Sequence, residues 1–465
     1  MDEKEYGSIF FDRRKVIRQH PCLIELPEDA SKSLLLGLSE DRFANIAYKK
    51  RGALPFIQPR GGFTLWRHQR ELTIALSEAG ADFIPLTIDS HTRHNDYDRA
   101  NALLKNSEAS GENLLNGYPL LAHGAGATRD LFDGIEKPIS LRHGTPDPRV
   151  LVEAALDAGI TEIEGGGLCY SLPYSRSYPI DRAILNWQYV DRLCAYLSTE
   201  EKPIHRESFG ALTATMVPPF MVIVVEILEL LLAAEQGVLS FAVSFAQTGS
   251  LVQDLATAAA LKSISAKKLR DFGFNTSVKL VFHQWMGAFP YDRVRAEALI
   301  SQGSVIAVLS GSDKVVVKTR TEALGIPDAK SNADAVITSK YSMELCNGAH
   351  SIVGGEVSEE AESIENAANY LLDAILNIGN GDAPLWARVT HAVRMGLIDI
   401  PFAPHQDNSN QLWSRRDLNR AIRVLDSGRV SLPKEFLDRE AKKLGNCSKP
   451  QSLDSMLDDI MIMVR

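Results

Sequence analysis

The feature that most constrains the fold is an alternation of short apolar runs with helical segments along most of the chain. Several runs are apolar at consecutive positions, which is typical of strands buried on both faces of a parallel sheet. Repeated strand–helix units form either an open doubly wound sheet or a closed barrel. We count nine candidate strands, one more than an eight-stranded barrel holds. They are Pro55–Pro59, Asp82–Asp89, Pro119–Gly124, Ile139–Gly144, Glu162–Gly167, His205–Gly210, Leu239–Phe245, Leu280–Trp285 and Lys314–Thr319.

The segments between the strands differ in polarity. Met221–Ala234 is almost wholly apolar but is interrupted by Glu226 and Glu229. Since it is too short to span a bilayer, we expect a buried helix packed on the sheet. Ser358–Leu376 has the periodicity of an amphipathic helix. The polar run Lys105–Asn113 predicts a surface loop.

Composition excludes several classes of protein. The formal net charge is −9 and there is no long run of lysine or arginine, so binding to nucleic acid is not expected. The five cysteines are scattered without a CxxC pair, which favours reduced thiols in the cytoplasm. The first residues, MDEKEYG, are acidic and indicate no signal peptide. No phosphate loop, complete dinucleotide fingerprint or zinc-ligand spacing is present, so we predict no metal ligand in this chain.

Three arginines stand at or just after the ends of candidate strands. Arg60 and Arg142 each close an apolar run, and Arg93 follows Asp89 by four residues. In a barrel the carboxyl ends of the strands meet at one mouth. A guanidinium binds a carboxylate through two parallel hydrogen bonds, so three arginines there suit a ligand with two carboxylates. Alternatively, each is an ordinary surface or salt-bridged arginine.

Glu164 ends another candidate strand and is followed by three glycines. Glycines at a strand end let a ligand approach the backbone closely, and a carboxylate there can hold an ammonium group. Tyr170 and Tyr174 follow at a turn, where they either contact the ligand or pack in the core. Lys318 and Glu322, four residues apart, either pair with each other or point into the mouth.

Together these strings resemble one family closely, the large (epsilon) subunit of glutamate mutase, also called methylaspartate mutase. The resemblance runs from about residue 50 to residue 410. The strings that carry it are Gln58-Pro59-Arg60-Gly61-Gly62, Thr87-Ile88-Asp89 with Thr92-Arg93, Leu114-Leu115-Asn116-Gly117, Arg142-His143-Gly144-Thr145-Pro146-Asp147, Glu164-Gly165-Gly166-Gly167, Pro173-Tyr174, Asn186-Trp187-Gln188-Tyr189, Val217-Pro218-Pro219, Leu232-Ala233-Ala234-Glu235-Gln236-Gly237, Phe282-His283-Gln284-Trp285-Met286-Gly287, Val317-Lys318-Thr319, Gly325-Ile326-Pro327 and Asp399-Ile400-Pro401-Phe402.

The resemblance implies a fold and a reaction. The fold is an α/β (β/α)8 TIM-type barrel with a C-terminal extension. We expect an N-terminal helical segment at 1–50, the catalytic barrel at 51–378 and the extension at 379–465. The reaction uses adenosylcobalamin, whose cobalt–carbon bond breaks homolytically, to interconvert L-glutamate and (2S,3S)-3-methylaspartate by a radical route.

The resemblance also implies a partner. In this family a small (sigma) subunit with a DxHxxG motif binds cobalamin and covers the barrel mouth. Here Asp89-Ser90-His91 begins that motif, but His94 replaces the glycine. We therefore expect a separate small subunit and, by analogy, a homodimer of this chain within a heterotetramer.

Site roles carry over position by position. The family's arginine claw on the two substrate carboxylates matches Arg60, Arg93 and Arg142. The other substrate positions match Glu164 on the ammonium group, as the expected catalytic acid, together with His143, Tyr170 and Tyr174. Positions lining the cofactor match Gly62, Asn116, Pro173, Phe289, Ile326 and the ribose-contacting pair Lys318 and Glu322.

The chain departs from the family pattern at Ser208–Ala214 and Ser244–Ser250. Neither departure touches the claw, so L-glutamate stays the expected substrate. Two other interpretations remain: a non-catalytic assembly subunit that keeps the barrel, and a barrel enzyme acting on a related dicarboxylate.

Overall fold

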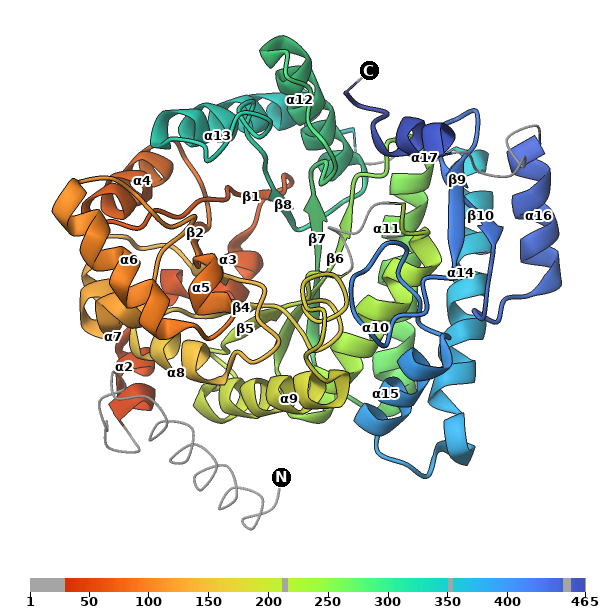
Figure 1. Ribbon diagram of the computed structural model, residues 1–465, viewed down its shortest axis with the longest axis horizontal. Helices are drawn as coiled ribbons and strands as arrows, with labels where there is room; N and C mark the ends of the chain where they lie inside the picture. The colour runs from red at the N-terminus through yellow and green to blue at the C-terminus, as the bar shows by residue number, and fades with distance from the viewer. Residues whose placement is uncertain (1–29, 211–215, 350–353, 446–452, 465) are drawn as a thin grey trace.

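The computed structural model describes residues 30–210, 216–349, 354–445 and 453–464, and its centre is an eight-stranded parallel sheet (Figure 1). The strands pair in the order β1-β8-β7-β6-β5-β4-β3-β2, each parallel to its neighbour. Their bounds are β1 Phe56–Gln58, β2 Ile84–Thr87, β3 Ile139–Arg142, β4 Glu162–Glu164, β5 His205–Glu207, β6 Ser240–Ala246, β7 Ser277–His283 and β8 Lys314–Val316.

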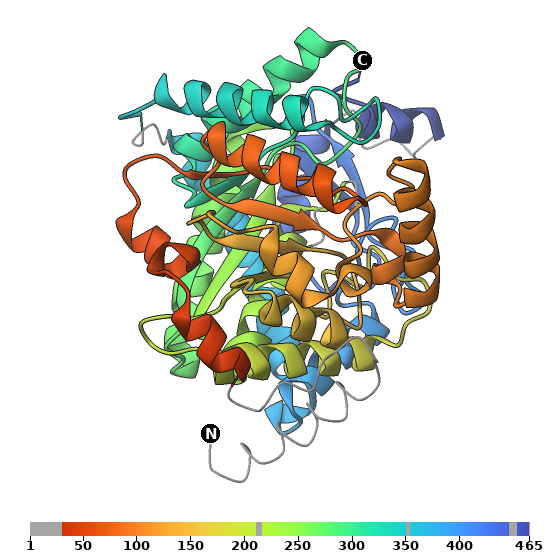
Figure 2. The same cartoon turned by 90° about the vertical axis from the view of Figure 1, so that its left-hand side faces the viewer.

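Single backbone hydrogen bonds join the two end strands and close the sheet into a barrel. The amides of Asp82 and Phe83 donate to the Ile57 carbonyl at 3.0 and 3.2 Å, and Thr87 donates to Gly61 at 3.1 Å. At least one helix follows every strand, and the helices form an outer ring (Figures 1 and 2). The (β/α)8 barrel is therefore confirmed. The ring consists of α4 Trp66–Glu78, α6 Tyr97–Ser110, α7 Leu120–Asp130, α8 Arg149–Asp157, α9 Ile180–Leu197, α10 Pro219–Glu235, α11 Leu251–Phe272, α12 Arg293–Leu309 and α13 Ala329–Glu344. The short helix α5 Ser90–Arg93 follows β2 and lies inside the ring, against α6.

Two predictions about local structure are wrong. The ninth candidate strand, Pro119–Gly124, forms the start of helix α7, with Pro119 at its N-cap and a kink at Gly124. The predicted loop Lys105–Asn113 is helical up to Ser110, where Gly111 ends α6 in a left-handed conformation. The polarity of such short runs does not decide between helix, strand and loop. The boundaries are marked by Pro119 at the start of α7 and by Gly111 at the end of α6.

The N-terminal ends of the strands are closed by a short helical segment. It consists of α2 (Ala30–Gly37), the 3₁₀ helix η1 (Glu40–Arg42) and α3 (Ala44–Lys50). Tyr48 of α3 packs on Phe56, Phe83 and His205 with ring centroids 5.5–5.7 Å apart. The barrel is thus plugged at this end. Residues 1–29 of the expected N-terminal segment lie outside the described residues.

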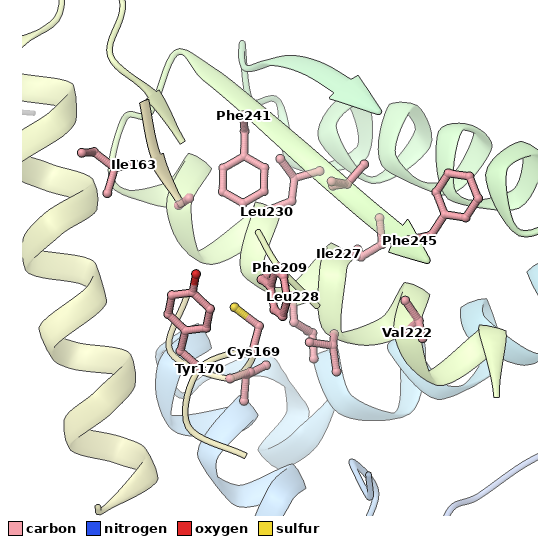
Figure 3. Close-up of a cluster of buried hydrophobic side chains, with 14 of the residues drawn as sticks. Ile163, Cys169, Tyr170, Phe209, Val222, Ile227, Leu228, Leu230, Phe241 and Phe245 are labelled. Atoms are coloured by element: carbon pink, nitrogen blue, oxygen red, sulfur yellow. The ribbon is translucent and has the colours of Figure 1, made fainter. Parts of the chain in front are cut away.

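The apolar segment Met221–Ala234 forms helix α10, which is buried along almost its whole length as predicted. One side packs on β6, and the other is covered by α14 (Gly355–Leu376), α11 and α15 (Leu385–Met395). Figure 3 shows Ile227, Leu228 and Leu230 among the buried side chains beside Phe241 of β6. Since α10 is enclosed on both sides, it needs no polar face. Among the described residues, no helix is both long and apolar enough to cross a membrane.

The rest of the C-terminal region lies against one side of the barrel (Figure 1). Helix α14, the amphipathic helix predicted at Ser358–Leu376, packs on α10 and α11. An antiparallel hairpin forms a separate two-stranded sheet. The remaining elements are the 3₁₀ helix η2 Ile378–Gly381, β9 Trp413–Arg416, β10 Ile422–Asp426, α16 Lys434–Leu444 and α17 Leu453–Ile460.

Candidate active site

Charged and polar side chains close several barrel strands at their carboxyl ends. Arg142 is the last residue of β3, Glu164 of β4, Glu207 of β5 and His283 of β7. Glu164 and Glu207 are register partners in neighbouring parallel strands, so their side chains point to the same face of the sheet. The fold therefore brings residues that are distant in sequence to one end of the barrel, where barrel enzymes place their active sites.

Arg142 and Glu164 contact each other at this end. Arg142 Nη1 lies 2.6 Å from Glu164 Oε2, and the Tyr170 hydroxyl donates to Glu164 Oε1 at 2.5 Å. The arginine is 3% and the glutamate 2% exposed. Burial raises the pKa of Glu164, and the adjacent Arg142 opposes that rise. A ligand that takes the arginine with a carboxylate and the glutamate with an ammonium would satisfy both charges again.

The other two predicted arginines lie near this pair. Arg93 is half-buried in the short helix α5, and its Nε donates to the Ile88 carbonyl at 2.6 Å. Burial lowers the pKa of Arg93, while Tyr170 and Tyr174 nearby oppose the change. Arg60, also half-buried, is close enough to Glu164 to lower its pKa. The structure therefore brings all three arginines to the same end of the barrel.

A group of aromatic rings surrounds Glu164. His143 stacks on Trp187 with centroids 5.5 Å apart and meets the edge of Tyr170 at 5.0 Å. Tyr170 in turn meets Tyr174 at 5.8 Å, and Phe209 lies 5.8 Å from Tyr170. Burial, helped by Arg93 and Arg206, holds the pKa of His143 well below its usual value. His143 is therefore neutral, and the rings keep water away from the charged pair.

Lys318 and Glu322 form an ion pair of 2.9 Å beside this site. Both are largely buried, so this is not an exposed pair on a helix surface. The Lys318 ammonium lies 5.9 Å from the centroid of the Phe289 ring. Burial, with a contribution from Arg60, lowers the pKa of Lys318 to about 8. The pairing considered from the sequence is thus confirmed, and it lies next to Arg60.

The remaining predicted cofactor positions differ in how far they are exposed. Gly62 is buried, and a Cβ there would lie 2.2 Å from the Thr87 carbonyl oxygen, so packing alone requires glycine. Asn116 is exposed, and its side chain accepts a hydrogen bond from the Ser90 amide at 2.9 Å. Pro173 is half-buried, and Ile326 is 56% exposed.

The glycines after Glu164 make room for the protein itself. A Cβ at Gly166 would lie 2.3 Å from the Glu229 carboxylate. That carboxylate accepts hydrogen bonds from the Leu168 and Cys169 amides at 2.7 and 2.9 Å. Figure 3 shows Cys169 and Tyr170 of this loop close to Phe209. At Gly166, therefore, the close approach of the Glu229 side chain requires glycine, and not the approach of a ligand expected from the sequence.

Sequence reasoning missed the residues that hold Glu164 in place. Arg206 pairs with Asp191 at 2.7 Å and donates to the carbonyls of Ile163 and Gly165, which flank Glu164. The available signal was a charged residue inside a buried element, such as Arg206 in β5 and Glu229 in helix α10. A charge buried in such an element needs partners, and here the partners are the backbone groups of the site.

Sequence reasoning also missed a cluster of buried charges inside the barrel, next to Arg142. Lys314 reaches Glu162 and Glu207 at 2.5 Å each and Gln58 at 2.6 Å, and Arg142 reaches Glu207 at 3.5 Å. Lys314, Glu162 and Glu207 are fully buried. Each is a charged residue in a strand that is otherwise buried.

Comparison with known proteins identifies the family of this chain. Residues 39–465 match the family model described as the methylaspartate mutase E chain (MutE). The chain is 40% identical over 394 residues to the glutamate mutase epsilon subunit of Treponema denticola, covering 84% of this chain and 81% of that protein. It is 37% identical to the epsilon subunit of Desulfitobacterium hafniense (90% and 88% covered) and 40% identical to that of Escherichia coli O157:H7 (82% and 79%). The chain therefore belongs to the methylaspartate mutase E chain family, the large-subunit family of glutamate mutase.

Proposed function

We propose that this chain is the catalytic subunit of an adenosylcobalamin-dependent isomerase that interconverts L-glutamate and (2S,3S)-3-methylaspartate. The observation that carries the proposal is the buried Arg142–Glu164–Tyr170 group, with Arg60 and Arg93 at the same end of the barrel. An amino acid with two carboxylates and one ammonium presents the charges complementary to this set.

In this proposal each group has a separate task. The guanidinium groups of Arg60, Arg93 and Arg142 bind the two carboxylates and fix the ligand's orientation. Glu164 accepts the ammonium, and the Tyr170 hydroxyl holds the Glu164 carboxylate. The surrounding rings exclude water, which strengthens these contacts and shields a reactive intermediate.

The residues beside the mouth fit the expected cofactor. A paired ammonium and carboxylate, Lys318 and Glu322, offer a donor and an acceptor suited to ribose hydroxyls. The neighbouring Phe289 ring and the exposed Ile326 side chain offer apolar contacts. When bound, adenosylcobalamin supplies the radical, and this chain's residues bind and orient the group.

A separate small subunit is part of the proposal, because the partial DxHxxG match has another role here. The Asp89 side chain caps helix α5 by accepting from the His91 and Thr92 amides at 2.9 and 3.0 Å. His91 lies 3.4 Å from Asp96. We further propose a heterotetramer of two copies of each chain. We place it in the cytoplasm, where the unpaired cysteines Cys169, Cys194 and Cys346 would stay reduced.

The first prediction concerns this partner. The isolated chain should be inactive and bind cobalamin weakly, because the match at Asp89–His94 forms a helix cap. Adding a small cobalamin-binding subunit should give turnover of L-glutamate in the presence of adenosylcobalamin. The measurements are 3-methylaspartate formation and equilibrium dialysis of cobalamin against each chain. Tight, stoichiometric binding by this chain alone would contradict the two-subunit proposal.

Two alternatives make different predictions in the same assay. An assembly subunit would bind the partner without turnover, whereas this chain keeps every claw arginine and Glu164. An enzyme for a related dicarboxylate would turn over that compound better than L-glutamate. The buried ammonium acceptor Glu164 favours an amino acid over a plain dicarboxylate.

The second prediction concerns Lys318 and Glu322. Lys318→Ala or Glu322→Ala should raise the concentration of adenosylcobalamin needed for half-maximal activity and lower kcat, with little change in the KM for L-glutamate. Interactions outside the reacting substrate that strengthen on the way to the transition state act on kcat in this way. The measurement is a kinetic titration of each ligand in the complete complex.

The pH profile gives the control. Since the pKa of Lys318 is lowered to about 8, its ammonium is lost as the pH rises through that value, and the ion pair with it. In the parent complex, kcat should fall above about pH 8, and in Lys318→Arg this fall should move to higher pH. An unshifted profile, with unchanged cofactor titration in both alanine variants, would assign the pair to packing alone.

A further inference from the structure

Arg142 has two carboxylate neighbours, and they differ in how firmly they are held. Glu164 Oε2 is the nearer, at 2.6 Å, and the other oxygen of Glu164 accepts from the neutral Tyr170 hydroxyl. Glu207 Oε1 lies 3.5 Å from the same Arg142 nitrogen. Its second oxygen lies 2.5 Å from the Lys314 ammonium. Glu207 therefore joins two cations, whereas Glu164 joins one cation and one hydroxyl.

Lys314 itself is fixed inside the barrel. It extends from β8 to Gln58 of β1, Glu162 of β4 and Glu207 of β5, all within 2.6 Å. All four residues are fully buried. Moving Glu207 would take one of two carboxylate partners from each of two buried cations, Lys314 and Arg142, which is costly. Turning Glu164 away from Arg142 costs less once a ligand is bound. The ligand's ammonium then pairs with Glu164, and its carboxylate pairs with Arg142.

The protonation of Glu207 supports the same division of roles. Burial alone would raise its pKa, but Lys314 and Arg142 outweigh burial and hold that pKa below its usual value. Glu207 therefore stays ionised across the working pH range. Burial raises the pKa of Glu164 instead.

We propose that Glu207, held by Lys314, is a positioning residue that keeps Arg142 paired while Glu164 exchanges this arginine for the ligand's ammonium. In this arrangement Glu207 touches neither substrate nor cofactor. It orients the Arg142 fork toward the ligand carboxylate and keeps part of the arginine's charge neutralised. This inference rests on the proposed function, because it takes the ligand to carry both carboxylates and an ammonium.

The test compares L-glutamate with glutarate, which has the same two carboxylates but no ammonium. In Glu207→Gln the guanidinium is less neutralised, and among the described residues Glu164 is then the one carboxylate within ion-pair distance of it. The site then favours the dianion glutarate over the monoanion glutamate, whose ammonium competes with Arg142 for Glu164. The ratio of the KM for glutamate to the inhibition constant of glutarate should rise at least about tenfold in the complete complex. A merely structural role would weaken both ligands by the same factor.

Three further variants keep the test decisive. Glu162→Gln is the matched control, because Glu162 also pairs with Lys314 but is not paired with Arg142. Its ratio should stay within about threefold of the parent. If Glu207→Gln does not fold, Glu207→Gln combined with Lys314→Gln removes the pair together and should shift the ratio in the same direction. Glu164→Gln combined with Glu207→Gln should change the ratio by less than the product of the single effects, because both act through Arg142.

The outcomes are separable from those of the proposed function. If the parent complex turns over glutamate but Glu207→Gln leaves the ratio unchanged, or if Glu162→Gln shifts it equally, the positioning role is wrong. If the parent complex does not act on glutamate at all, the proposed function has failed before the variants are compared.

Discussion

Replacing Arg142 by lysine should lower kcat/KM for L-glutamate about ten- to a hundred-fold. Lysine keeps the positive charge but loses the planar fork that binds a carboxylate with two hydrogen bonds. One hydrogen bond to a charged group contributes about 1.5–3 kcal/mol, which corresponds to that range of rate constants. Arg142 is buried and already pairs with Glu164 and Glu207, so a shorter cation cannot shift to restore the contact. The measurement is steady-state kinetics of the complex with saturating cofactor.

Arg60→Lys and Arg93→Lys should have effects of the same kind, and Arg51→Lys supplies the control. Arg51 pairs with Asp313 at 3.1 Å, at the opposite end of the barrel strands. The same chemical change there should leave kcat/KM close to the parent value. Parental kinetics in all three claw variants would refute the claw assignment. A loss in Arg51→Lys equal to theirs would show that the effect is general destabilisation.

The fold could be predicted largely from the sequence, because buried parallel strands leave a strong local pattern. Eight of the nine candidate strands match β1 to β8 of the barrel, and helices α10 and α14 lie where their apolar residues predict them. The ninth failed at Pro119, where a short apolar run fits a buried helix as well as a strand. Such runs are ambiguous until proline and glycine boundaries are considered.

The candidate site was predicted less completely. The arginines and Glu164, which were predicted from their places at strand ends and their match to family positions, lie at the same end of the barrel. Glu207 and Lys314 were not found, because their role depends on contacts across the barrel that no local spacing encodes. Lys314 and Glu162 are 152 residues apart in sequence yet form a buried pair. A charged residue in a buried strand signals that such a partner exists but does not identify it.

Replacing Glu164 by glutamine should impair turnover of L-glutamate about as strongly as the claw variants, while the fold survives. The amide keeps the shape and can still accept from the Tyr170 hydroxyl, so the loop after β4 stays in place. The loop is held independently by Arg206 and by Glu229. What the variant loses is the negative charge that faces the ligand's ammonium, a contact worth about 1.5–3 kcal/mol. The measurements are kcat/KM of the complex and the thermal melting of the chain.

Inhibition by glutarate distinguishes the loss of the Glu164 charge from general damage to the site. Since glutarate carries no ammonium, its inhibition constant should not worsen in Glu164→Gln. It should improve, because Arg142 is then shared with Glu207 alone and is more available to a ligand carboxylate. A variant that melts like the parent, loses glutamate turnover and binds glutarate at least as well would place the ammonium on Glu164. Unchanged glutamate kinetics in a folded variant would make Glu164 a structural partner of Arg142, and the ligand's ammonium would then lie elsewhere in the site.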